Sequence, residues 1–167
     1  MSKLRMPALI VVIIIQLFAP AYMIANKYYI INTGEEFRFR VSPVDPSDAF
    51  RGRYVALNAA QSGEPLKGRY GILAVGADGF AEIASATDKK PSSGSYVKSS
   101  DSIWFILPIN RYYMDEKLAP EAELLTRRVV SEKETFVTVR VKNGELVITG
   151  LFVGGVAIEE AIINRLQ

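Results

Sequence analysis

A stretch without charged residues, Pro7–Ala25, constrains this 167-residue chain more than any other feature. Its first half is almost continuously aliphatic, from Ala8 to Ile15. A helix of this length rises about 28 Å, which is close to the hydrocarbon thickness of a bilayer. A backbone in lipid must satisfy its own hydrogen bonds, so the segment should be helical although many of its residues are β-branched. The stretch therefore predicts a transmembrane helix over residues 7–25, in contact with the lipid bilayer.

The flanking charges predict how this helix is oriented. Lys3 and Arg5 precede the stretch, and no acidic residue does. Positive residues favour the cytoplasmic side, so residues 1–6 should be a cytoplasmic tip. Residues 28–167 should then form one extracytoplasmic domain. The sequence has no Asn-x-Ser/Thr acceptor site for glycosylation. The simplest location is a signal-anchored position in the bacterial inner membrane, with the domain in the periplasm.

Two other interpretations of the apolar stretch compete with a membrane anchor. A buried core helix is one, although uncharged runs of this length are rare in soluble folds. A cleaved signal peptide is the other, because Ala19-Pro20-Ala21 places small residues at a suitable spacing. Against cleavage, the apolar run continues to Ala25. With a signal peptide the domain would still be exported.

The rest of the chain has the pattern of a mainly β domain. Glu35–Val41 and Thr135–Val141 alternate polar and apolar residues, as half-buried strands do. Asp78-Gly79 and Asn143-Gly144 are hairpin turn signals. Seven or so short strands about a dozen residues apart predict a compact antiparallel sheet, folded onto itself in a barrel-like manner.

Other segments carry weaker patterns. We expect a short extended segment over 28–34, a long exposed loop over 88–102, and either two strands or one bent edge strand over 102–114, where Pro108 interrupts an apolar run. One or two short helices are expected, at 119–125 and in 156–166, where a strand end is the alternative.

Composition narrows the chemistry. The chain has no His and no Cys, which removes the usual neutral-pH base, thiol nucleophiles and standard zinc sites. No Gly-rich phosphate-binding loop is present. Two of the 20 Lys and Arg residues precede the apolar stretch, leaving 18 against 18 Asp and Glu. This balance does not favour a nucleic-acid partner. We predict no catalytic residue, cofactor or metal site.

Two arginine clusters, Arg51-Gly52-Arg53 and Arg111-Tyr112-Tyr113, are the main candidates for a functional role. Arginine binds carboxylates through two parallel hydrogen bonds and stacks on aromatic rings. The favoured interpretation is internal pairing with Asp45, Asp48, Glu116 or Glu123, which would hold a rigid turn to the sheet. The alternative is a groove for a partner segment or an anionic headgroup.

The first cluster belongs to a motif that resembles the GDYXXLXY family of membrane-anchored bacterial proteins. The residues that fit are Pro43, Val44, Asp45, Pro46, Arg51, Gly52, Tyr54 and Leu57. Residues 111–123 resemble the family's second block, which contains Arg111, Tyr113, Glu116 and Glu123. Two positions depart: Arg53 stands where the motif has Asp, and Ala59 where it ends in Tyr. The resemblance implies no established activity, but association with polytopic membrane proteins.

These observations lead to two hypotheses of different class. The first is a non-enzymatic envelope module, anchored through residues 7–25, that binds or stabilises a polytopic membrane protein. The second is an exported hydrolase or small-ligand-binding domain that uses the arginine and carboxylate cluster. A large exposed apolar surface would favour the first hypothesis, and a deep pocket at that cluster the second.

Overall fold

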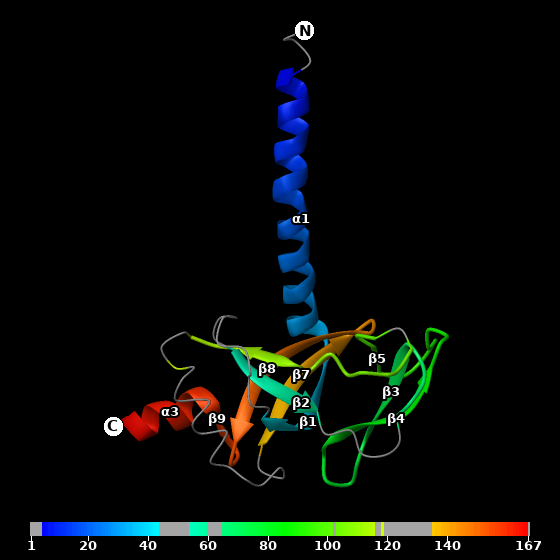
Figure 1. Ribbon diagram of the computed structural model, residues 1–167, viewed down its shortest axis with the longest axis vertical. Helices are drawn as coiled ribbons and strands as arrows, with labels where there is room; N and C mark the ends of the chain where they lie inside the picture. The colour runs from blue at the N-terminus through cyan, green and yellow to red at the C-terminus, as the bar shows by residue number, and fades with distance from the viewer. Residues whose placement is uncertain are drawn as a thin grey trace.

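A long helix stands on a β domain in the computed structural model of this chain (Figure 1). The structure describes residues 5–43, 54–59, 65–101, 103–115, 118 and 135–166. The elements are α1 (Arg5–Thr33), β1 (Glu35–Pro43), β2 (Tyr54–Ala59), β3 (Tyr70–Val75), β4 (Ala81–Thr87), β5 (Tyr96–Lys98), β6 (Arg111–Tyr113), β7 (Thr135–Lys142), β8 (Glu145–Val153), β9 (Val156–Ala157) and α3 (Ile158–Leu166).

The strands form two antiparallel sheets. The larger sheet is six-stranded, in the order β6-β2-β1-β7-β8-β9, and the smaller is three-stranded, in the order β4-β3-β5. A bridge between Val97 of β5 and Gly144 of the β7–β8 turn joins them. The mainly β, antiparallel fold expected from the sequence is confirmed. The described strands stay open at β6, β9 and β4, so they do not close into a barrel.

The core lies where β1, β7 and β8 turn their apolar residues inward. Along β7, buried and partly buried side chains alternate without a break, as its sequence pattern predicts. Phe37 of β1 lies opposite Val139 of β7, and Phe39 lies opposite Val137. Helix α3 covers this core with Ile158 and Ile162, which are one turn apart and completely buried.

Helix α1 is longer than the sequence predicted. The expectation of an extended segment over 28–34 is wrong, because α1 continues to Thr33. Once a helix is nucleated, adding residues costs little, even when they are β-branched. Carbonyl groups in the last turns of the helix find donors. The side-chain amide of Asn32 donates to the Tyr28 carbonyl at 2.7 Å, and the backbone amide of Gly34 donates to the Ile30 carbonyl at 2.7 Å. Pro20 lies inside this helix.

Two other segments also differ from expectation. The predicted loop over 88–102 contains β5, which pairs with β3 and reaches Gly144. Among the described residues of 102–114, β6 is the one strand, and the irregular segment before it buries Phe105, Leu107 and Ile109. The C-terminal segment forms both a strand, β9, and a helix, α3. The helix expected over 119–125 lies outside the described residues.

Candidate functional site

The clearest cluster of side-chain contacts in the described structure is the junction where the last two turns of α1 meet the β7–β8 hairpin. Glu145, the first residue of β8, accepts two hydrogen bonds there. Lys27 Nζ lies 3.0 Å and Asn26 Nδ2 lies 3.1 Å from the same Glu145 oxygen. Ile30, about one turn further along α1, is only 2% exposed, and α1 contacts both β7 and β8. The junction therefore combines an apolar contact with polar contacts at its rim.

Lys142, the last residue of β7, reaches the helix from the other arm of the hairpin. Its Nζ donates to the Thr33 carbonyl at 3.2 Å and lies 4.8 Å from the centre of the Tyr29 ring. A cation near a helix C-terminus interacts favourably with the unpaired carbonyls there. A lysine over an aromatic ring adds a cation–π attraction. Lys142 thus binds the helix end that Glu145 does not reach.

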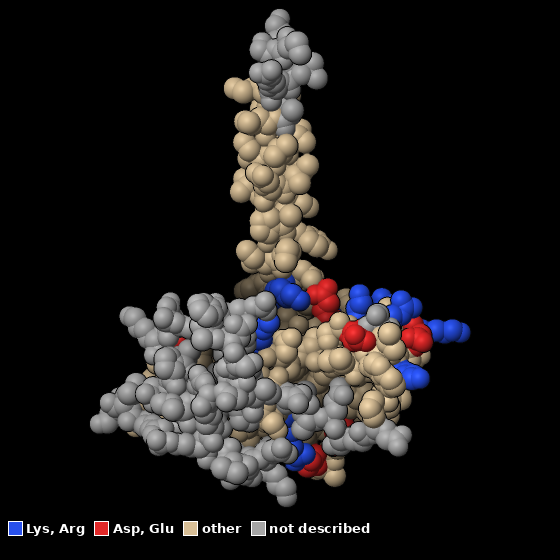
Figure 2. Space-filling view, viewed as in Figure 1, with Lys and Arg blue, Asp and Glu red and all other residues tan. Residues whose placement is uncertain are grey.

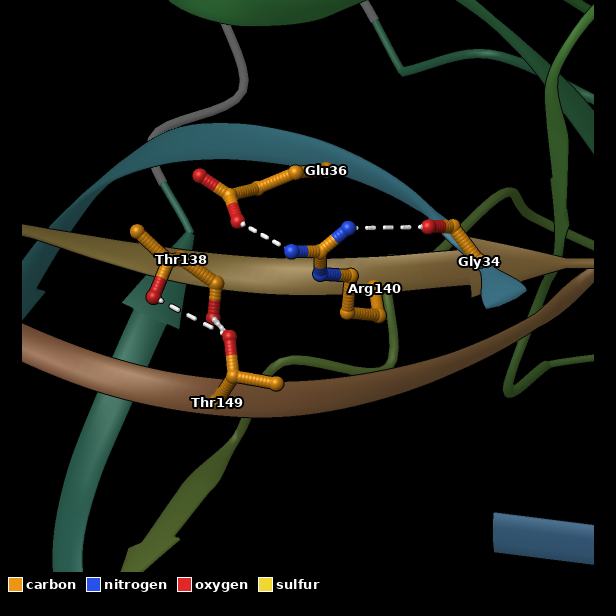
Figure 3. A network of polar contacts seen from close by, with 5 residues as sticks. All are labelled: Gly34, Glu36, Thr138, Arg140 and Thr149. Carbon is orange, nitrogen blue, oxygen red and sulfur yellow. Dashed lines mark hydrogen bonds and ion pairs between the residues drawn. The ribbon is translucent and has the colours of Figure 1, made fainter. Parts of the chain in front are cut away.

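Arg140 continues these contacts along β7, as Figure 3 shows. One of its guanidinium nitrogens donates to the Gly34 carbonyl at 3.1 Å, and another lies 2.9 Å from a Glu36 carboxylate oxygen. Through these two contacts, Arg140 holds the step from α1 into β1. Next to them, the Thr149 hydroxyl of β8 donates to the Thr138 carbonyl of β7 at 3.2 Å. A Cβ at position 34 would lie 2.5 Å from the Ile30 carbonyl oxygen, so this step requires glycine.

A polar depression of about 670 Å³ adjoins the junction. Its lining consists of residues 90–96 and of Val141, Lys142 and Asn143. The charged residues in this lining are both lysines, Lys90 and Lys142, and they lie near a run of serines. One of these serines, Ser95, donates a hydrogen bond from its hydroxyl to the Glu35 carboxylate. The depression offers hydrogen-bond donors and positive charge to a small anionic group.

Figure 2 shows how charge is distributed around this site. The described part of the helix is uncharged on the visible face down to its base. Lys, Arg, Asp and Glu side chains then appear together along the edge of the domain nearest the helix. Within the described residues, no group of three or more His, Cys, Asp or Glu side chains is placed to hold a metal.

Part of the sequence motif comes together on three adjacent strands. Pro43 of β1 lies opposite Leu57 of β2, and Tyr54 of β2 lies opposite Tyr113 of β6. Arg111 pairs with Ala56 on the same strands. Leu57 is a core residue, 4% exposed. The remaining candidates, Asp45, Pro46, Arg51, Gly52, Glu116 and Glu123, lie outside the described residues.

The second arginine cluster contains a contact that the sequence did not predict. The hydroxyl of Tyr112, on β6, donates to the Glu159 carboxylate of α3 at 2.6 Å. Burial of this half-buried phenol, together with its hydrogen bond to Glu159, raises the Tyr112 pKa above its usual value. The pair attaches α3 to the edge strand of the larger sheet.

Sequence reasoning also missed the junction residues Lys142, Glu145, Arg140 and Glu36. The available signals were Lys27, a lone charge just beyond the apolar stretch, and the Asn143-Gly144 turn flanked by Lys142 and Glu145. Neither signal predicts that Lys27 and the Asn143-Gly144 turn lie close together in the fold. That proximity depends on the helix continuing to Thr33.

Comparison with known proteins gives one result. No curated protein and no solved structure matches the chain. The family model described as GDYXXLXY protein matches residues 16–151, from inside α1 to near the end of β8. That match covers 136 of the 167 residues, the difference between 151 and 16 plus one. The chain therefore belongs to the GDYXXLXY family.

Proposed function

We propose that this protein is a signal-anchored module of the bacterial inner membrane, with its N-terminus in the cytoplasm and its β domain in the periplasm. In this role it is not an enzyme, and it binds or stabilises a polytopic membrane protein. Of the described helices, α1 is the one that is long and apolar enough to cross a membrane, over Leu9–Thr33. Its large apolar side chains from Leu9 to Ile24 are exposed, an arrangement that suits lipid and is costly in water.

The single observation that carries the proposal is the docking of α1 on the β7–β8 hairpin. Asn26 and Lys27 follow the charge-free stretch directly, and both bind Glu145. The headgroup layer of a bilayer begins where its hydrocarbon ends. The hairpin turn therefore belongs at headgroup depth, with the domain held in a fixed orientation against the bilayer. A fixed orientation suits a module that meets another membrane protein at the surface.

Orientation is testable because the chain has no native Cys. Single-cysteine variants Ser92→Cys, in the exposed part of the domain, and Ser2→Cys, in the predicted cytoplasmic tip, are treated with a membrane-impermeant maleimide on intact spheroplasts. The proposal expects labelling of Ser92→Cys alone, with both labelled after lysis. Labelling of Ser2→Cys alone would show the opposite orientation, with the N-terminus outside and the β domain in the cytoplasm. The mass of the mature protein tells a retained helix from a cleaved one.

The partner hypothesis is tested by crosslinking and pull-down from the membranes of the cell that makes the protein. The control replaces residues 1–26 with a cleavable signal, which exports the domain without its helix. We expect one polytopic protein at near-stoichiometric yield with the full chain. Its loss in the control would place the contact in the helix. Recovery of no specific protein with either form would contradict the partner function.

The depression beside the junction supports a second candidate, a small-ligand-binding domain. The supporting observation is that both of the charged residues lining it are lysines, Lys90 and Lys142. Of the arginine and carboxylate residues considered from the sequence as a groove, Arg111 is the one that lies within the described residues. Calorimetric titration of the full chain in detergent with inorganic phosphate, compared with Lys90→Gln, tests this candidate. Binding that Lys90→Gln leaves unchanged would place the anion elsewhere.

A further inference from the structure

The charge-free stretch contains one amide side chain, Gln16, at its centre. Gln16 lies nine positions after Pro7 and nine positions before Ala25. If the stretch spans the bilayer as proposed above, Gln16 lies at the midplane. Its side chain is exposed on α1, and in the described structure no side chain reaches it with a hydrogen bond.

Pro20 leaves a second polar group unpaired at the same place. In an α-helix, the carbonyl of residue 16 accepts its hydrogen bond from the amide of residue 20. Pro20 lies inside α1 and has no backbone N–H. The Gln16 backbone carbonyl therefore loses its normal donor. The amide side chain and the freed carbonyl come together on one residue, farthest from water.

Unpaired amide and carbonyl groups are unfavourable in hydrocarbon, where no water can replace the missing partner. In membrane proteins such groups are satisfied by side chains of neighbouring helices. We propose that Gln16 is the intramembrane contact of this protein with its partner. The contacting element is a transmembrane helix of a polytopic protein that carries a hydrogen-bonding side chain, such as Ser, Thr, Asn or Gln, at the same depth.

The face on which Gln16 lies indicates what this partner helix must look like. Lys27 follows Gln16 by eleven residues, about three turns, and Ile30 follows by fourteen, about four turns. Gln16 therefore shares a face with Lys27, which pairs with Glu145 of the hairpin, and with the buried Ile30. A partner helix packed against Gln16 therefore lies directly over the β domain. At its periplasmic end this partner helix must continue into a short loop, because the β domain occupies the space just outside the membrane there.

The same geometry argues against a second copy of this chain as the occupant. Packed helices lie about 8–10 Å apart. The β domain extends to both sides of the base of α1 (Figure 1). In a two-fold pair joined through Gln16, each domain would have to fill space that the other already occupies. A polytopic protein with short outer loops has no such conflict.

The test places a photo-crosslinking amino acid at one of two positions in the full-length chain, in membranes of the cell that makes it. Met23 follows Gln16 by about two turns and lies on its face, whereas Phe18 lies on the opposite face. We expect an adduct from Met23 that mass spectrometry maps to a transmembrane helix of one protein, and a much weaker adduct from Phe18. Gln16→Leu should lower the Met23 adduct by about three- to tenfold. Gln16→Asn should retain most of it.

Pro20→Ala restores a donor to the Gln16 carbonyl and keeps the side-chain amide, so we expect a smaller loss than with Gln16→Leu. An undiminished Met23 adduct in Gln16→Leu, an equal adduct from Phe18, or an adduct joining two copies of the chain would overturn the proposal. This inference rests on the proposed partner function, and the two can fail separately. A partner that the pull-down recovers equally well from Gln16→Leu sinks this inference alone. Recovery of no protein by either method sinks both.

Discussion

Lys27 and Glu145 form an ion pair with 3.0 Å between Nζ and the carboxylate oxygen, although they lie 118 positions apart in the sequence. The pair joins the end of α1 to the start of β8. Both side chains are 51% exposed, so the pair contributes little to stability and serves mainly to orient the helix on the hairpin. Ile30, about one turn further along α1, is buried, and burial of an apolar side chain is worth more than an exposed ion pair.

Ile30→Ala should therefore loosen the junction. Removing a buried isoleucine side chain costs about 2 kcal/mol or more, because apolar contact is lost and a cavity remains. Trypsin cleavage after Lys27 requires local opening, so its rate should rise about tenfold or more in detergent-solubilised full-length protein. Ile31→Ala is the matched control, since Ile31 is 41% exposed. Equal acceleration by both variants would show that Ile30 does not hold the helix.

Asp78 links the β3–β4 turn to β1 and should make stability depend on pH. Its carboxylate lies 2.7 Å from an Arg40 guanidinium nitrogen and accepts a hydrogen bond from the Phe80 amide at 3.2 Å. The Arg40 hydrogen bond, followed by that of Phe80, holds the Asp78 pKa below its usual value. Because its pKa is lower in the folded state, the ionised Asp78 carboxylate stabilises the protein at pH values above the ordinary Asp pKa. This stabilisation is lost as the pH falls below about 4.

The measurement for Asp78 is urea unfolding of the wild type and of Asp78→Asn between neutral pH and pH 3. We expect the wild type to be the more stable at pH 7 and the difference to shrink on acidification. Asp88→Asn, also at an exposed aspartate in a loop, is the control. A difference that stays constant with pH would mean that the charge of Asp78 is not what stabilises the turn.

Tyr112→Phe should destabilise the attachment of α3 to β6. The variant removes the 2.6 Å hydrogen bond to Glu159 and leaves that carboxylate without this donor. We expect a loss of about 1 kcal/mol in the free energy of unfolding. A double-mutant cycle with Glu159→Gln isolates the pair, because the double variant should lose less than the two single variants together.

The raised pKa of Tyr112 adds a test of its own. A raised folded-state pKa stabilises the protein below the ordinary Tyr pKa, and this contribution is lost as pH rises above about 10. The stability advantage of the wild type over Tyr112→Phe should therefore decline in alkaline solution. An advantage that grows with pH would contradict the assigned hydrogen bond.

Gly71→Ala should destabilise the smaller sheet for a steric reason. A Cβ at this position would lie 2.4 Å from the Phe105 ring, which packs over β3. Overpacking of this kind costs about 1–3 kcal/mol. Adding Phe105→Leu to Gly71→Ala provides space for the new methyl group, so the pair should be less destabilising than the sum of the single changes. Strict additivity, measured by chemical unfolding, would exclude the predicted clash.

Local sequence patterns predicted much of the fold. The alternation over Thr135–Val141 and the Asn143-Gly144 pair predicted β7 and its turn to β8, where both turn residues have positive φ, at 54° and 82°. These elements were predictable because burial of one sheet face imposes a period of two on the sequence. The charge-free stretch likewise predicted the helix, though not its length.

Tertiary contacts decided what the local pattern could not. Residues 28–33, Tyr-Tyr-Ile-Ile-Asn-Thr, suit either an extended or a helical backbone, and burial of Ile30 where α1 contacts β7 and β8 favours the helix. The three residues of β5 form a strand because β3 and Gly144 supply its partners. Of the predicted site, the structure assembles Pro43, Tyr54, Leu57, Arg111 and Tyr113 on neighbouring strands.

The sequence by itself determined that a helix with a long charge-free stretch precedes a mainly antiparallel β domain, since periodicity and charge are properties of neighbouring residues. Only the tertiary structure decided that the helix joins the domain without a linker, through Lys27, Ile30 and Glu145. Contacts between residues more than a hundred positions apart depend on how the sheet folds, and no local pattern encodes them.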